Sequence, residues 1–542
     1  MRPIACRIID HNRAMRCLLV IFFVNIFCFL SSAQSPYVLT YEDVDLQDGI
    51  LEEFRYSGEG NDPEWVVIPD DMNVTEITFF GFHDKEKYGG GTLKRVTLPS
   101  TLRRISDGAF ANCKLEYVDF NEQLEFIGYQ AFARNKLQSV LLPEKLSVCC
   151  NCAFSGNPIV EIRWPTVPIS RISGFDYILT LRNVEIPANV KSIGSGAFGG
   201  TPLESLHFNE GLDSICANAF LYSQSYGTKV DFSLFNQLDF PNSLSYIGPG
   251  AFAGQVNLSE INFGNSLRKI DRAAFRGCGK LQGVLLPESL DSLGNLAFSE
   301  CSNLTSIVFN DNLKFIGNYA FDNCKNLSNY RLPEYLSYLG EYAFSRTLID
   351  DLYIPGSLKK VRHHTFSYCS YTPSATITFA DGIEEICDSA FYRIVRITED
   401  SDFSDSVSVV FPNTLKRIGN SAFEMVWVKQ TRLPERDSNG NRLRWDAYLK
   451  GVLDESDVKY IGGFMRTGFQ RAALYEYVAS VVDDEPVASM QTLKKERVKV
   501  RIIDIYGRPV PSHYASTSNL PYGLYVRIAD DGSAALIIGG KR

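Results

Sequence analysis

The residue types that do chemistry in proteins are sparse in this sequence. It has six histidines in 542 residues, and only His363 and His364 are adjacent. Imidazole is a common metal ligand, but a metal needs ligands that converge on one point. Side chains of adjacent residues at a bend of the chain point in different directions, so we expect no metal at this pair.

Three closely spaced thiols, Cys149, Cys150 and Cys152, are the second candidate group. They are interpreted either as small buried residues or as partners in a disulfide with Cys216 or another neighbour. A metal is the third interpretation, but no companion ligand is visible. The sequence leaves these alternatives open.

Five further cysteines share one position, three residues after a phenylalanine. They are Cys113, Cys278, Cys301, Cys324 and Cys369. Parallel side chains stacked in a column do not give a disulfide the dihedral angle that it needs. We therefore expect buried, reduced thiols in this column.

Composition narrows the function further. Hydrophobic residues make up 45% of the chain and charged residues 22%, as in ordinary globular proteins. The formal net charge is -9, and no block of Lys and Arg is long enough to neutralise a row of phosphates, so nucleic acid is not an expected partner. No nucleophile, base and metal-ligand set converges, so we expect no enzyme, no cofactor and no metal.

The N-terminal segment has the pattern of a secretory signal peptide. Four arginines precede an apolar run of about 14 residues, 17–30, and small residues follow at 31–33. The run is shorter than the roughly 20 residues of a membrane span. We expect residues 1–33 to be removed on export and the mature chain to have no membrane span; Met15 is an alternative start.

A repeat dominates the remaining sequence. Phenylalanine, usually preceded by Ala, recurs mostly every 22 or 23 residues, which predicts a solenoid of about 15 coils. Tyr177 is expected to take the Phe position in one degraded copy, and Phe82 to belong to an imperfect first copy. The thirteen recurring residues are Phe110, Phe132, Phe154, Phe198, Phe220, Phe252, Phe275, Phe298, Phe321, Phe344, Phe366, Phe391 and Phe423.

One regular copy, residues 281–301, predicts how a coil is built. Apolar residues at alternate positions, such as Val284, mark a first short strand, and a second follows the turn at Pro287. Gly294 is expected to supply backbone angles that suit a corner. Phe298 is expected to fill the core, because stacked copies bury an apolar edge that one copy cannot bury alone.

The consensus L-x-x-I-x-L-P-x-x-L-x-x-I-G-x-x-A-F-x-x-C resembles the leucine-rich repeat of the BspA-like bacterial surface proteins. The resemblance covers about residues 67–430. It implies a β-rich leucine-rich repeat solenoid without enzymatic activity. It also implies adhesion to host or neighbouring-cell proteins of the matrix type.

The ends of the chain depart from the repeat. Residues 34–66 are expected to form a capping hairpin between strands near 49–56 and 65–68, and residues 431–485 to hold degenerate last coils with an insertion. Longer spacings predict insertion loops at 222–236 and 393–408. Residues 486–542 resemble the all-β sorting domain of the type IX secretion system, through a hydrophobic-D-x-x-G-R-x-V element and an L-P-x-G-L-Y-V element; a plain β cap is the alternative.

A column of outward strand positions is the candidate binding surface. Its apolar section, Leu285 and Val308, lies beside Arg331 and Tyr353, a composition common in protein-binding patches. An ordinary sheet face with scattered apolar residues explains the same pattern.

The sequence thus predicts an exported binding scaffold, at the surface of a Gram-negative bacterium or outside it. One alternative is a glycan-binding or nutrient-capture component, for which Trp164 and Tyr353 are the aromatic candidates. Another is an enzyme whose site is built from insertion loops at 424–482. The ligand, the oligomeric state and cleavage of the C-terminal module are not determined by the sequence.

Overall fold

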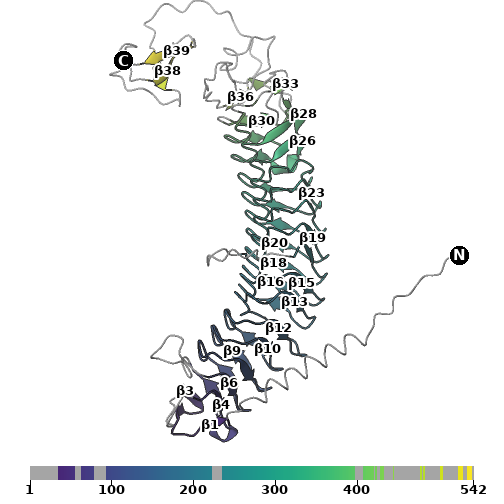
Figure 1. Cartoon of the computed structure of the whole chain (residues 1–542). Helices are drawn as coiled ribbons and strands as arrows, with labels where there is room; N and C mark the ends of the chain where they lie inside the picture. Colours follow the sequence, from purple (N-terminus) through teal and green to yellow (C-terminus); the bar gives the residue numbers. More distant parts are fainter. Residues whose placement is uncertain are drawn as a thin grey trace, which may run out of the picture. The chain divides into compact units, whose positions relative to one another are not determined.

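The computed structural model describes residues 35–54, 63–78, 93–222, 235–396 and 407–419, and short segments between residues 422 and 539. The chain forms two compact units, residues 1–147 with 153–165 and residues 148–152 with 166–542. Within each unit, short strands of successive coils stack on one another (Figure 1). No helix in the described part of the chain is long and apolar enough to span a membrane. The expected signal peptide, residues 1–33, lies outside the described residues.

Unit 1 contains two parallel ladders of strands, one from each side of its coils. The first ladder holds β1 (Tyr37–Val38), β4 (Trp65–Val67), β6 (Arg95–Thr97) and β8 (Tyr117–Asp119), and β10 (Ser139–Leu141) pairs with β12 (Glu161–Arg163). The second holds β3 (Ile50–Phe54), β5 (Glu76–Ile77), β7 (Arg104–Ile105) and β9 (Phe126–Ile127). A single-turn 3₁₀ helix, η1 (Asp70–Met72), lies between β4 and β5.

A hairpin closes the second ladder of unit 1, but its strands are not the expected ones. β2 (Val44–Gln47) pairs antiparallel with β3 around the turn at Asp48 and Gly49. Trp65–Val67, expected to be the return strand, pairs in parallel with β1 and β6. The repeat therefore begins with β4, because its Val66 is as fully buried as Val96 of the next coil.

The first-strand side of unit 2 is divided into several small parallel sheets. β13 (Asn183–Ile186) pairs with β15 (Ser205–Phe208), β17 (Gln237–Asp239) with β19 (Glu260–Asn262), and β21 (Gly283–Leu285) with β23 (Ser306–Val308). A larger sheet follows: β26 (Leu348–Ile354), β28 (Ser370–Phe379), β31 (Val407–Val410) and β33 (Val428–Arg432), with β30 (Val395–Arg396) beside β28.

The second-strand side of unit 2 is more continuous. One sheet contains β14 (Ser192–Ile193), β16 (Ser214–Ile215), β18 (Tyr246–Ile247), β20 (Lys269–Ile270), β22 (Ser292–Leu293), β24 (Phe315–Ile316) and β25 (Tyr338–Leu339). Another contains β27 (Lys360–Val361), β29 (Glu385–Ile386), β32 (Arg417–Ile418) and β35 (Tyr477–Val478). Two short elements, the strand β11 (Val148–Cys149) and the 3₁₀ helix η2 (Gly356–Leu358), complete the coils.

The C-terminal segments are described only as strands. β34 (Leu443–Arg444) pairs with β36 (Ser480–Val481), and β37 (Arg501–Asp504), β38 (Gly523–Ile528) and β39 (Ala534–Gly539) form an antiparallel sheet. The expected insertion loops at 222–236 and 393–408 lie mostly outside the described residues. The described residues form a β-solenoid of about 13 turns, fewer than the roughly 15 expected from the spacing. The copy expected at Phe82 is also outside the described part.

One stacked phenylalanine per coil forms the centre of the solenoid. Consecutive rings are nearly parallel: Phe275 and Phe298 lie 5.3 Å apart, and Phe298 and Phe321 lie 5.7 Å apart. The eight Phe residues expected in the core are at most 1% exposed; they are Phe110, Phe132, Phe198, Phe252, Phe275, Phe298, Phe321 and Phe344. Burying a ring of this size contributes about 1.5–3 kcal/mol, so the column is a main source of stability.

Tyr177 does not take the Phe position of the degraded copy, contrary to the prediction from its spacing. Phe175 takes it, with 0% exposure and a ring 5.8 Å from that of Phe198. The Phe175 amide donates to the carbonyl of Ala197, as the other core Phe amides do to the next coil. This copy lacks the Ala-Phe pair, so its register is set by the ring that fits the core.

Each core Phe lies between two residues with left-handed backbone. In the coil of Phe298 these are Leu296, with φ 61°, and Glu300, with φ 65°. Alternate amides therefore point the same way: those of residues 296, 298 and 300 donate to carbonyls of residues 318, 320 and 322, at 2.8–2.9 Å. The Phe turn is thus a third hydrogen-bonded side of the coil, and coils stay joined there without strands.

Side chains three residues after the Phe donate hydrogen bonds to the preceding coil. The Cys301 thiol donates to the carbonyl of Phe275 at 3.3 Å, and the Asn157 amide donates to that of Phe132 at 2.7 Å. Cys, Asn and Thr are interchangeable here because each supplies a small buried donor. The sequence alone predicted only that the column cysteines are buried, reduced thiols. The structure shows that they also donate hydrogen bonds.

Gly294 is required for a different reason from the one expected. Its φ is not left-handed, so backbone freedom does not explain it. A Cβ at this position would lie 2.5 Å from the amide nitrogen of Arg272 and 2.6 Å from the carbonyl carbon of Asp271. The glycine lets consecutive coils approach, and its own amide donates to the Ile270 carbonyl.

We predict that Phe298→Ala lowers the free energy of unfolding by about 3–5 kcal/mol, because it opens a cavity between two stacked rings. Asn303→Ala, at an exposed position of the same coil, is the control and should change it by less than about 0.5 kcal/mol. Denaturant unfolding measures both. Equal stability of the two variants would show that the Phe column is not the core.

Candidate binding site

The cysteine cluster of the sequence forms no disulfide. Cys149 is buried and Cys150 and Cys152 are half-buried, and neither these three nor Cys216 is joined in a disulfide. Burial raises the pKa of the Cys149 thiol above its ordinary value, which keeps it protonated. Within the described ranges, no group of three or more His, Cys, Asp or Glu side chains could hold a metal.

The thiols three residues after a Phe are likewise not accessible for catalysis or metal binding. Cys278, Cys301 and Cys324 are 0% exposed free thiols on consecutive coils. Burial raises the pKa of Cys278 and of Cys324, because a thiolate would lose its solvation there. These residues are structural donors.

The two adjacent histidines lie in different environments, one in solvent and the other in a stack of aromatic rings. His363 is exposed, whereas the His364 ring lies parallel to that of Tyr342 at 4.6 Å, next to Tyr319 in the same stack. Burial lowers the pKa of His364, and the neighbouring His363 lowers it further. The pair therefore does not converge on one point.

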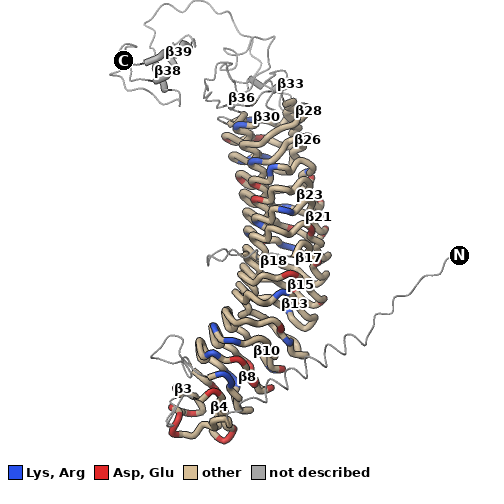
Figure 2. The backbone as a smooth tube through the Cα atoms, in the orientation of Figure 1, with Lys and Arg blue, Asp and Glu red and all other residues tan. Residues whose placement is uncertain are grey.

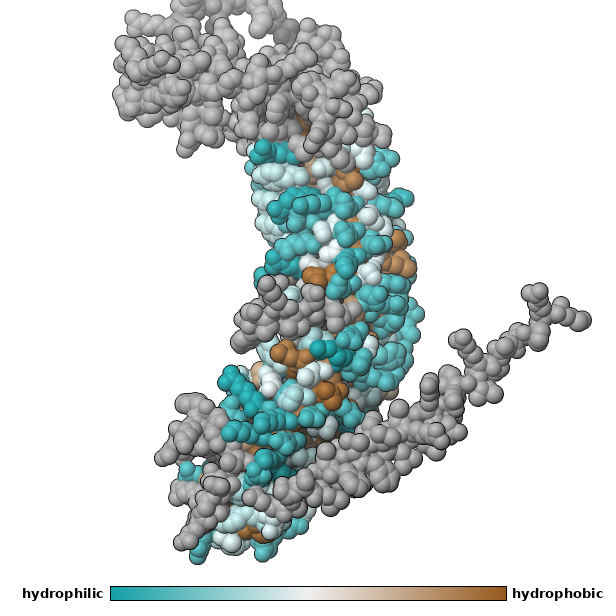
Figure 3. Space-filling view, viewed as in Figure 1, coloured by the Kyte–Doolittle hydropathy of each residue, from teal (hydrophilic) through white to brown (hydrophobic). Residues whose placement is uncertain are grey.

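The outward column predicted from the sequence is formed by paired strands. Leu285 lies opposite Val308 in the pairing of β21 with β23, and Tyr353 lies opposite Thr378 in the pairing of β26 with β28. Leu285 is 66% exposed and Val308 is 56% exposed, so the two form an apolar step on the surface. On the face drawn in Figure 3, hydrophobic residues otherwise form separate spots among hydrophilic ones.

The strand ladder is interrupted directly after this apolar step. Tyr330 holds the inward position that Ile307 holds one coil earlier, and its ring stacks on Phe344 at 4.6 Å. In this coil a single bridge, from Ser306 to Asn329, takes the place of a strand pair. Among the described strands, β23 pairs only with β21, and β26 only with β28.

The second ladder is interrupted at the next boundary, between the coils of Phe344 and Phe366, where the first ladder also has no strand pair. Arg362 takes the position that Gly317 and Gly340 hold in the preceding coils, where there is no room for a Cβ close to the neighbouring backbone. In the described part of unit 2, β25 and β27 do not pair. We call the boundary between the coils of Phe344 and Phe366 the seam.

Two arginine–tyrosine contacts bridge the seam, one on each side of the coil. The Arg331 guanidinium lies 5.5 Å from the ring centre of Tyr353, and that of Arg362 lies 4.3 Å from the ring centre of Tyr338. Such contacts contribute about 0.5–1 kcal/mol at exposed sites. The Phe turn also continues, since the Phe344 amide donates to the Thr365 carbonyl at 2.9 Å. The seam thus keeps the Phe-turn bonds and one backbone bond on the first-strand side, from the Leu348 amide to the Leu327 carbonyl at 3.1 Å, and side-chain contacts take the place of strand pairing.

A surface pocket of about 480 Å³ lies beside the seam, next to Arg331. Its apolar lining comes from Phe309, Leu332 and Pro333. Its polar rim includes Asp311 and Glu334, together with Tyr335, which is 70% exposed. The four predicted residues lie on four consecutive coils, from that of Phe298 to that of Phe366, and form the strip; the sequence did not indicate the pocket.

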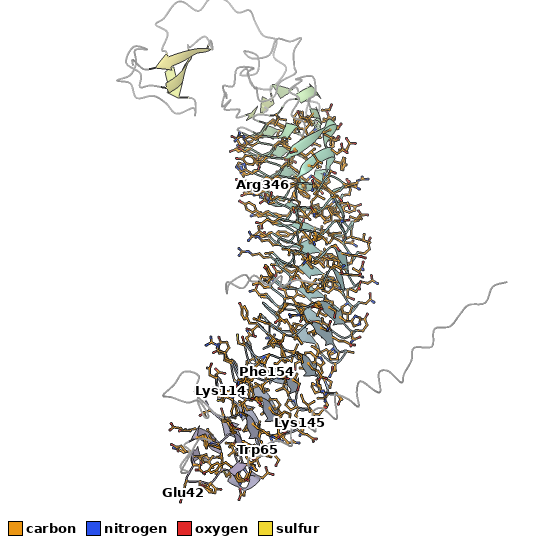
Figure 4. All side chains as sticks on the ribbon, in the orientation of Figure 1. Glu42, Trp65, Lys114, Lys145, Phe154 and Arg346 are labelled. Carbon is orange, nitrogen blue, oxygen red and sulfur yellow. The ribbon has the colours of Figure 1, made fainter. Side chains whose placement is uncertain are left out.

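A second aromatic cluster, in unit 1, was not predicted. The Arg95 guanidinium lies between two rings, 4.2 Å from the centre of Trp65 and 5.0 Å from that of Tyr117, and bonds Asp119 at 2.8 Å (Trp65 is labelled in Figure 4). Trp65, Arg95 and Tyr117 share one outward position on consecutive strands. Aligning the position two residues before the analysed column would have found them.

Neither the strip in unit 2 nor the aromatic cluster in unit 1 has a dominant charge. Lys and Arg alternate with Asp and Glu along the described coils (Figure 2). Many are paired between coils, as Arg346 is with Asp322 at 2.5 Å. Apolar exposure and the seam, not a dominant charge, distinguish the strip in unit 2.

Several solved structures are similar to this chain. A leucine-rich repeat protein from Bacteroides ovatus is 22% identical, with 57% of this chain and 82% of that one covered and a TM-score of 0.41. A leucine rich cell surface protein from Faecalibacterium prausnitzii is 20% identical, with 69% and 98% covered and a TM-score of 0.34. The pneumococcal vaccine antigen PcpA is 16% identical, with 70% and 93% covered and a TM-score of 0.35. Similarities at this level carry no argument about function.

The family is shown by the repeat itself. No curated protein matches the sequence significantly. The model of the BspA type leucine rich repeat region, in six copies, matches residues 64–174, 171–237, 231–318 and 296–424, more than half of the chain. The chain therefore belongs to the BspA-type leucine-rich repeat family.

Proposed function

We propose that this chain is an exported cell-surface scaffold that binds proteins through the strip formed by Leu285, Val308, Arg331 and Tyr353. The observation that carries the proposal is the exposed Leu285–Val308 step at the point where the strand ladder stops. Apolar surface beside Arg and Tyr side chains is the composition of binding hot spots. Membership of the BspA-type family supports a binding role without catalysis.

A partner protein of the matrix type is favoured over a glycan. Sugars bind aromatic residues through exposed ring faces, and the best-placed aromatic pair, Trp65 and Tyr117, has Arg95 between its rings. Trp164, the other aromatic candidate, is half-buried directly after β12. The alternative of an enzyme site at 424–482 falls almost entirely outside the described residues.

We predict that Arg331→Ala with Tyr353→Ala weakens binding to a captured partner by at least about 2 kcal/mol, about 30-fold, because both side chains are hot-spot types on the strip. The partner comes from capture of purified matrix proteins by the full chain, with a glycan array run in parallel. Affinity is then measured by surface plasmon resonance.

The matched control for this experiment is Glu185→Ala with His207→Ala, two exposed side chains paired across β13 and β15 in the same outward column. The control should bind as the unmodified chain does. Equal affinity of both double variants would remove the strip from the interface. Capture of glycans and no protein would replace the proposal with its alternative.

We further propose that residues 486–542 direct export at a Gram-negative cell surface, on the strength of their sequence resemblance. A chain truncated after Glu485 should then fold but stay in the periplasm, because solenoid contacts are local to neighbouring coils. Fractionation and surface labelling, with the full chain as control, measure its location. Normal surface levels of the truncated chain would reduce this segment to a cap.

A further inference from the structure

The pocket beside the seam combines an apolar floor with an acidic rim. Leu332 is 1% exposed and Pro333 is buried, whereas Phe309 is half-buried and meets Phe321 edge-on at 5.8 Å. The accessible ring surface that the pocket offers to a chain of methylene groups therefore comes from Phe309 and from Tyr335, which is 70% exposed. The volume of the pocket, about 480 Å³, is ample for one side chain of a partner.

The two carboxylates of the rim have no counter-charge within the described chain. Asp311 and Glu334 are exposed and occupy equivalent turn positions on consecutive coils. Neither makes an ion pair with a described Lys, Arg or His, in contrast to Asp322, which pairs with Arg346. The rim is therefore negative and ready to accept a cation.

Arg331 does not cancel this charge, although it lines the pocket. Its guanidinium lies over the ring of Tyr353 across the seam, 5.5 Å from the ring centre. No ion pair joins it to Asp311 or Glu334 within the described residues. Arg331 thus contacts Tyr353 across the seam, and the two carboxylates of the rim make no ion pair with it.

We propose that the pocket receives a lysine or arginine side chain of the partner protein. The methylene stem lies on Phe309, the cation contacts Asp311 and Glu334, and the exposed ring of Tyr335 adds a cation–π contact. An acidic side chain would meet two carboxylates, and a purely apolar one would desolvate them without a partner. The formal charge of the chain, -9, favours a basic surface on the partner.

This inference rests on the proposed function, but it is tested without the partner. The probes are Ac-Gly-Lys-Gly-NH2, its Nε-acetyl-lysine counterpart and Ac-Gly-Glu-Gly-NH2. Saturation-transfer-difference NMR on the full chain detects which peptide methylenes contact the protein. We expect transfer to the lysine methylenes, and a signal at least about five-fold weaker for both other peptides, because charge and stem are needed together.

The variant Asp311→Asn with Glu334→Gln should reduce the lysine signal at least about five-fold, because it removes the counter-charge and keeps the shape of the rim. Glu116→Gln with Glu122→Gln, two exposed acids of unit 1, removes the same charge elsewhere and should leave the signal unchanged. Equal signals from lysine and acetyl-lysine, or no loss in the rim variant, would overturn the inference. Either result leaves the strip experiment unaffected, so the two proposals fail separately.

Discussion

The stack of one phenylalanine per coil, with its own amide bonded to the next coil, is the interaction on which the rest of the structure depends. The left-handed residues on either side of Phe298 aim three alternate amides at the next coil, and the ring packs 5.7 Å from Phe321. Because this turn secures each coil to its neighbour, strand pairing on the other two sides can be lost locally. Cys301 and Asn157 add buried donors to the same turn.

The seam shows what that freedom allows. Neither β26 nor β27 pairs with a described strand of the preceding coil, in which Tyr330 takes an inward position and stacks on Phe344. The Phe turn continues through the seam, so the solenoid is not broken. Its surface changes instead. The exposed pair Leu285 and Val308 is followed by Arg331, whose guanidinium lies over the ring of Tyr353, and a pocket lies next to Arg331. The proposed binding strip is thus a local departure from the repeat.

The sequence predicted the structural features that recur in most copies of the repeat. The buried Phe column, the stacked solenoid and the outward column follow from the periodic spacing, and the resemblance of the consensus to the BspA-like repeat implied the leucine-rich repeat fold. Phe175 was missed because that copy lacks the Ala-Phe pair, and the role of Gly294 was misjudged because close approach of two coils leaves no mark in one copy. The seam was missed for a similar reason. Tyr330 resembles a tolerated core substitution, and its residue type does not reveal that its coil forms no described strand on this side.

Amide hydrogen exchange tests most directly the claim that the Phe turn, and not strand pairing, joins the coils at the seam. The amides of Tyr330, Arg331 and Leu332 make no backbone hydrogen bond within the described chain, whereas those of Phe344 and Arg346 donate across the seam at 2.9 and 3.0 Å. The account predicts that residues 330–332 exchange at least about 100-fold faster than residues 344–346. Equal protection of the two segments would contradict it.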